Sequence, residues 1–152
     1  MRRYNGFSNA TNTASAANPL AAVSALGATT RARVYDFVVG SDATPADAAT
    51  KLALQRVTTS GLGTTVVVPP ALDGGDPASL MQWFSAWTST QPTVTAVSTL
   101  LQVAMNQRAT FRWVAVPDSE LVVPATLASG IAVMSIVASA TANYAFSMMW
   151  QE

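Results

Sequence analysis

The sequence predicts a mainly all-β protein, built as a β-sandwich or a barrel, with an extended N-terminal arm and one short helix. Short runs in which apolar and polar residues alternate recur from residue 31 to the end of the chain. Turn residues separate these runs at the spacing that is typical of antiparallel sandwiches and barrels. One segment has the period of an amphipathic helix instead.

The composition favours a single domain with a weakly charged surface. The chain has 152 residues, which is enough to bury a hydrophobic core. Half of the residues are hydrophobic and 11% are charged, against about 25% charged in ordinary globular proteins. The eight basic and eight acidic residues cancel, which argues against binding to nucleic acid or to an acidic membrane surface. Because little charge repulsion keeps copies apart, we expect a homo-oligomer.

The first 30 residues predict an extended N-terminal arm. They are rich in Ala, Asn, Ser and Thr and have no sustained hydrophobic period, so they bury little surface. Two interpretations stay open: a disordered tail, or an arm that becomes ordered on a neighbouring subunit with Tyr4 and Phe7 as anchors. Mostly polar residues separate Arg2 and Arg3 from the apolar residues after Pro19, so we expect mature chain rather than a signal peptide.

Strands are predicted through most of residues 31–152, the expected sandwich domain. The run at 33–39 and the run at 51–59 alternate, and a strand at 64–68 ends at two prolines. Between the first two strands, TPADAA predicts a short helical turn with Thr44 as its cap. After Pro92 the expected strands are 93–97, 100–105, 109–116, 120–123, 131–138 and 143–150.

The last predicted strand has two different faces. Its large side chains share one face, which we expect in the core: Tyr144, Phe146, Met148 and Trp150. The opposite face carries smaller side chains. We expect another layer or a subunit to approach that face.

The predicted helix lies in DPASLMQWFSAWTST, residues 76–90. Asp76 fits the N-cap and Pro77 the first helical position. The apolar residues stand at i, i+3, i+4 and i+7, which is one helical face: Leu80, Trp83, Phe84 and Trp87. We expect Trp83 and Trp87 to pack on a sheet rather than to bind a ligand.

The residue types that are present argue against an enzyme. The chain has no His and no Cys, on which most nucleophilic and acid–base mechanisms depend. The single Lys51 has no Ser three residues before it, and no glycine-rich phosphate motif occurs. We therefore expect no catalytic residue, no cofactor and no metal site.

Two carboxylate pairs need separate consideration, namely Asp73 with Asp76 and Asp118 with Glu120. Carboxylates are ligands for Ca²⁺, but these stand where Asp caps turns, and we favour the turn. A glycosidase-type carboxylate pair stays open on sequence grounds.

Charge is concentrated in NQRATFRWVAVPDSELVVPAT, residues 106–126, which contains Arg108, Arg112, Asp118 and Glu120. The alternation predicts a hairpin in which 109–116 pairs with 120–123. Phe111 and Trp113 would then share one face, with Arg112 on the other. Opposite charges would face each other across the hairpin. They either brace it within one protomer or form an ion pair between two protomers.

A resemblance to a known family rests on RVYDFVVGSDATPADAATKLALQRVTTSGLGTTVVVPPALDGGDPAS followed by NQRATFRWVAVPDSELVVPAT. These phrases resemble small virion proteins of tailed bacteriophages, including those of cyanobacteria, over about residues 31–152. The resemblance implies a β-sandwich, with the jelly roll as one version. It also implies a capsid decoration (cement) protein on the capsid surface of the virion, a homotrimer whose partner is the major capsid protein.

We therefore predict subunit contacts rather than an active site. The predicted contact residues are Tyr4, Phe7, Arg108, Arg112, Asp118 and Glu120. Two alternatives stay open. A jelly-roll coat protein would be expected to have a strongly basic arm, and Arg2 and Arg3 are few for that role. A β-sandwich binding module, of the tail or carbohydrate-recognising kind, would use Trp83, Trp87 or Trp113 as a stacking platform.

Overall fold

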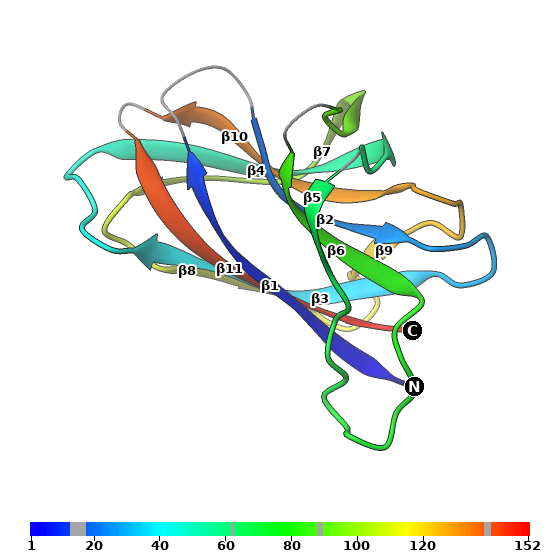
Figure 1. The fold of residues 1–152 in the computed structure, drawn as a ribbon. Helices are drawn as coiled ribbons and strands as arrows, with labels where there is room; N and C mark the ends of the chain where they lie inside the picture. Colours follow the sequence, from blue (N-terminus) through cyan, green and yellow to red (C-terminus); the bar gives the residue numbers. More distant parts are fainter. Residues whose placement is uncertain (13–17, 62, 88–89, 139–140) are drawn as a thin grey trace.

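Two antiparallel sheets stacked face to face make up the computed structural model (Figure 1), which describes residues 1–152 except 13–17, 62, 88–89 and 139–140. Sheet A contains β1 (Arg3–Asn12), β3 (Ala32–Asp42), β8 (Phe111–Val114), β9 (Leu121–Val123) and β11 (Ala142–Gln151). Sheet B contains β2 (Asn18–Ala25), β4 (Ala49–Thr59), β5 (Gly63–Val67), β6 (Met81–Trp87), β7 (Thr93–Asn106) and β10 (Gly130–Ala138). The predicted β-sandwich is confirmed.

The strand order is that of a jelly roll with an inserted hairpin. Sheet A has the order β1-β11-β3-β8, with β9 also paired to β3, and sheet B has the order β5-β6-β2-β10-β4-β7. When β5 and β6 are set aside and β8 and β9 are counted as one interrupted strand, eight strands remain. They are ordered 1-8-3-6 in one sheet and 2-7-4-5 in the other, which is the double Greek key of a jelly roll. The inserted pair extends sheet B beyond β2.

The core lies between the sheets and is built from alternate side chains of each strand. In β11 the four large side chains predicted for the core are all at most 3% exposed. They pack with inward residues of sheet B, such as Val23, Leu54 and Ile131, in one hydrophobic cluster. The ring of Phe146 also stacks on that of Phe37 from β3, with centroids 6.5 Å apart. The predicted inward face of β11 is therefore confirmed.

The predicted strands of residues 31–152 are found with small differences. The runs at 93–97 and 100–105 form one continuous strand, β7, in which φ of Val97 is 56°. A β-branched residue is strained in this left-handed conformation, so Val97 marks an irregularity in the strand. Residues 43–48 contain bends and no helical turn, so the prediction for TPADAA is wrong.

The predicted N-terminal arm is wrong, because residues 3–12 and 18–25 are strands of the sandwich, so a domain boundary at residue 31 does not exist. β1 pairs along its whole length with β11, and β2 lies between β6 and β10. The inward side chains of β1 after Tyr4 are small or polar, so the alternation carries almost no hydropathy signal. Small residues are nevertheless needed here: a Cβ on Gly6 would lie 2.4 Å from the ring of Trp83. Residues 13–17 of the predicted arm lie outside the described residues.

The predicted helix is also wrong, because residues 81–87 form β6. Met81, Trp83 and Ser85 alternate toward the core, while Phe84 is only 8% exposed on the opposite face. β6 carries apolar residues on both faces, although Ala86 on the outer face is exposed, and their spacing also fits a helical period. Hydrogen-bonded partners on both sides, β2 and β5, favour the strand. Trp83 is fully buried, which confirms that it packs on a sheet; residues 88–89 lie outside the described residues.

We predict that Gly6→Ala destabilises the protein by about 1–3 kcal/mol, because the added methyl group overlaps the rigid indole of Trp83. The entropy gain of replacing Gly, roughly 0.4–1 kcal/mol, is smaller. Urea unfolding measures the difference. Gly27→Ala is the matched control, because nothing lies within 4 Å of its added Cβ. An unchanged midpoint for Gly6→Ala would show that residues 3–12 do not pack as β1.

A second prediction concerns pH. Burial raises the pKa of the phenol of Tyr144 above its usual value of 10.0. The folded state then keeps Tyr144 neutral at pH values where the unfolded chain ionises it. The contribution to stability is therefore complete below pH 10 and is lost as the pH rises further. Urea midpoints measured from pH 7 to 11.5 should fall above pH 10, and less steeply in Tyr144→Phe. Equal slopes for the two proteins would contradict the prediction.

Candidate interaction surface

Arg112 of β8 and Asp36 of β3 form an ion pair on the outer face of sheet A. The Nε of Arg112 donates to Oδ1 of Asp36 at 3.1 Å, and Nη2 donates to Oδ2 at 2.6 Å. This bidentate geometry fixes the guanidinium plane. The Asp36 side chain is 5% exposed and that of Arg112 62%. The hydrogen bond to Asp36 raises the pKa of Arg112, so Arg112 stays charged.

This ion pair belongs to two rows of outward side chains that cross four strands of sheet A. The strand register places Phe7, Ser147, Val38 and Arg112 in one row, and Asn5, Met149, Asp36 and Val114 in the next. The hydroxyl of Ser147 donates to the Asn5 side chain at 2.8 Å and links the rows. We call these eight residues the outer face of sheet A. Their formal charges cancel, and Phe7 and Val114 remain 52% and 54% exposed.

Polar side chains at one end of sheet A bond to each other. The Asn9 amide donates to Asp42 at 2.7 Å, and the Thr11 hydroxyl donates to Asn143 at 2.7 Å. These bonds join β1 to β3 and to β11. The side chains beside the outer face are thus held in place before any partner binds.

The structure places two of the six predicted contact residues, Phe7 and Arg112, on one face of sheet A, at opposite ends of one row. Tyr4 does not anchor a neighbouring subunit. It is fully buried, its hydroxyl donates to the Pro77 carbonyl at 2.9 Å, and its ring contacts that of Trp150 at 6.4 Å. In the sequence, Tyr4 is an aromatic residue in a mostly polar segment. Its inward direction follows from the alternation of side chains along β1, for which this segment gives almost no hydropathy signal.

The predicted hairpin between 109–116 and 120–123 is wrong. β8 pairs with residues 36–39 of β3, and β9 continues in the same direction along residues 32–34. The PDS turn is a loop that leaves the sheet and returns to the same edge. The alternation of the two segments is the same for both arrangements, so it did not distinguish them. Phe111 and Trp113 do share one face, opposite Arg112, as predicted, and the structure shows that this face lies toward the core.

The remaining charged residues of this segment do not pair across it. Arg108 lies 3.9 Å from Asp47, and both side chains are more than half exposed. Asp118 is exposed in the loop with φ at 66°, a conformation that Asp tolerates better than most residues. Glu120 lines a shallow hollow with Arg3 and Tyr35. Sequence reasoning did not include Asp36 among the contact residues. The available signal was a charged residue inside the alternating run RVYDFVV.

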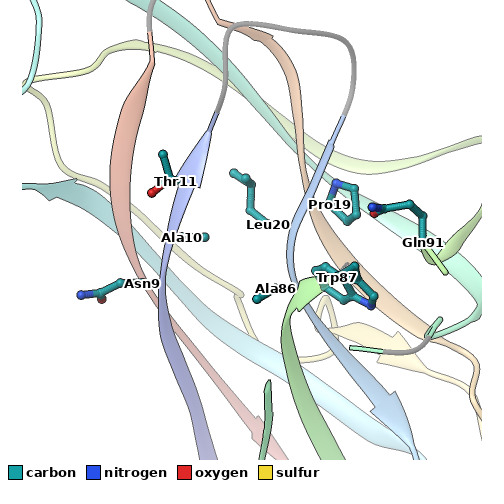
Figure 2. A pocket seen from close by; sticks show the side chains of 8 residues that line it. All are labelled: Asn9, Ala10, Thr11, Pro19, Leu20, Ala86, Trp87 and Gln91. Carbon is teal, nitrogen blue, oxygen red and sulfur yellow. The ribbon is translucent and has the colours of Figure 1, made fainter. Parts of the chain in front are cut away.

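A groove lies beside the edge strand β1, where the two sheets diverge (Figure 2). Its volume is about 520 Å³, within the usual range for ligand sites. β1, β2 and β6 supply most of its lining, which is Asn9, Ala10, Thr11, Pro19, Leu20, Ala86, Trp87 and Gln91. None of these eight residues is charged. The indole N–H of Trp87 donates to the Ser60 carbonyl at 2.8 Å, which orients the half-buried ring.

The described residues contain no cluster of three or more His, Cys, Asp or Glu side chains that would hold a metal ion. In the turn after β5, Oδ1 of Asp73 accepts the Gly75 N–H at 3.0 Å, which is the predicted turn chemistry. No described helix is long and apolar enough to cross a membrane. Comparison with protein families, with curated proteins and with solved structures found no match for this chain.

We predict that Arg112→Glu lowers the melting temperature by several degrees, because it places a second carboxylate beside the buried Asp36. Arg108→Glu is the control, since its exposed pair at 3.9 Å contributes little. Differential scanning calorimetry measures both. Adding Glu120→Arg should not restore Arg112→Glu, because the two positions do not pair. A restored melting temperature would reinstate the hairpin.

Proposed function

We propose that this chain is a non-enzymatic structural protein of a virus particle. Specifically, it is a capsid decoration protein that binds the shell and stabilises it through contacts with subunits. The observation that carries the proposal is the outer face of sheet A, a rigid and electrically neutral surface on a jelly-roll sandwich. Its one ion pair is already formed within the protomer. Docking such a face requires little desolvation of unpaired charge.

The resemblance of residues 31–152 to small phage virion proteins supports the same proposal. Shell proteins work by contact area, and specific interfaces of this kind bury about 1,200–2,000 Å² in total. Repetition over the copies in a particle multiplies a modest contact by avidity. The major capsid protein is the proposed partner, together with further copies of this chain.

The alternatives fit the described residues less well. A carbohydrate-binding module needs a tryptophan ring open to solvent, but Trp83 and Trp150 are fully buried and Trp87 and Trp113 are half-buried. A coat protein that contacts the genome would be expected to use a basic arm. Residues 4–30 carry no charge, and most of them form β1 and β2 of the sandwich.

The proposal is tested on particles of the source virus. We expect mass spectrometry of purified particles to detect the chain, and a cryo-EM map to place its sandwich on the outside of the shell. Absence of the chain from purified particles would end the proposal.

A variant test locates the contact. Phe7→Glu combined with Val38→Glu puts two charges on the outer face of sheet A, which must be desolvated on docking. We expect this variant to lose at least tenfold in binding to particles that lack the chain, as measured by cosedimentation. Val97→Glu, at a fully exposed position of β7 in sheet B, is the control and should bind normally. Equal binding of both variants would exclude the outer face of sheet A as the contact.

A further inference from the structure

The edge of β1 that faces away from β11 is covered by described residues only over its first part. The Asn5 N–H donates to the Pro70 carbonyl at 3.1 Å, and the Arg3 carbonyl accepts the Leu72 N–H at 2.8 Å. Both residues therefore direct their backbone groups away from β11. Because the register of β1 with β11 is unbroken and antiparallel residues alternate, Phe7, Asn9 and Thr11 do the same. No described residue bonds to the edge groups of these three residues.

The chain itself fills the first part of this edge. Ala71 forms an antiparallel bridge with Tyr4, so residues 70–72 act as a short added strand. The ladder stops beside Asn5, where Pro69 and Pro70 have no N–H to donate. The edge at Phe7, Asn9 and Thr11 continues the same line. An extended segment laid along it would prolong a ladder that the fold has already begun.

The groove of Figure 2 is the space that such a segment would fill. Sheet A ends at β1, whereas β6 and β5 extend sheet B beyond β2. The segment would have the backbone of β1 on one side. Its inward side chains would lie toward Leu20 of β2 and Ala86 of β6, which line the groove. Because the lining has no charged residue, it favours uncharged side chains on the occupant.

The overhang of sheet B, namely β5 and β6 where they extend beyond β2, also decides which occupant fits the groove. A second copy that paired through its own β1 would bring its own β5 and β6 into the same space. Two strands project by roughly 10 Å, whereas paired edges lie about 4.8 Å apart, so the two overhangs would collide. Every described strand of a copy is already paired in its own sheets, so donating one would break that copy.

We propose that the free edge of β1 binds one extended, uncharged peptide segment of a second protein as an added strand. Backbone hydrogen bonds to Phe7, Asn9 and Thr11 hold the segment, and small apolar side chains of the segment occupy the groove. This is recognition by β-strand addition. It is independent of the proposed location in a virion.

The probe is the acetylated and amidated heptapeptide Thr-Val-Ser-Ala-Thr-Val-Thr, added at millimolar concentration to the full chain. NMR hydrogen exchange reports on single amides. In the free protein we expect the amides of Phe7, Asn9 and Thr11 to exchange rapidly. With the peptide, their exchange should slow at least tenfold.

Two controls isolate the backbone contact. Asn9→Pro removes an N–H that the fold does not use, and proline is tolerated at such edge positions; it should abolish binding. Asn9→Ala loses the same side chain but keeps the N–H, so binding that Asn9→Pro loses beyond Asn9→Ala reports the backbone contact. If Asn9→Pro fails to fold, as judged by circular dichroism, the heptapeptide with alternate residues N-methylated replaces it, because that peptide lacks the donors for one edge.

Three results would overturn the proposal. The first is unchanged exchange at all three amides with the heptapeptide. The second is equal binding of the peptide to Asn9→Pro and Asn9→Ala, or equal binding of the methylated peptide to the natural chain. The third is slow exchange in the free protein together with a dimer mass by light scattering, which would assign the edge to a second copy.

Discussion

The packing of Trp83 between the sheets is the contact on which the rest of this structure depends. Its ring lies under Gly6 of β1, close enough that a Cβ there would overlap it, and its indole N–H donates to the Ser8 hydroxyl at 3.0 Å. Trp150 of β11 also lies beside Gly6. The inserted strand β6, the first strand and the last strand therefore meet at one point.

Burial of two indoles supplies a large apolar area that short, Ala-rich strands could not supply themselves. This contact positions β1 as an edge strand above the overhang of sheet B, and so creates the groove.

Some of the scarce charged side chains of the chain are bonded inside the protomer. Asp36 holds Arg112 on the outer face of sheet A. Glu152 accepts hydrogen bonds from the Leu80 N–H and the Trp150 indole, and so ties the entry of β6 to the end of β11. Charges that are paired in this way direct no long-range field toward a partner. Association then depends on shape, backbone groups and contact area, which is how the outer face of sheet A and the edge of β1 are proposed to act.

The accuracy of the sequence predictions followed the strength of the local signal. Apart from β6, the strands from residue 31 onward were found because β-branched and aromatic residues alternate there, and the inward face of β11 was assigned correctly for the same reason. β1 was missed because Gly6, Ser8 and Ala10 face inward, so its alternation is one of size and not of hydropathy. β6 was taken for a helix because apolar residues on both of its faces hide the strand period of two.

Of the candidate contacts, Phe7 and Arg112 share a row, but Asp36 as the partner of Arg112 depended on the pairing of β8 with β3. Residues 76 apart in sequence carry no local sign of such a pairing.

The sequence by itself determined the class of this protein: an all-β fold with a weakly charged surface and without the residue types of most catalytic sites. These properties follow from composition and from side-chain alternation, which are local. The tertiary structure decided the jelly-roll order, the inclusion of residues 3–12 and 18–25 in the sheets, and the continuation of β8 into β9 along β3. It also decided that one edge of β1 remains half covered. These features depend on which strands become neighbours. Pairing is chosen by the burial of side chains from distant segments, above all Trp83 against Gly6, and no single segment contains that information.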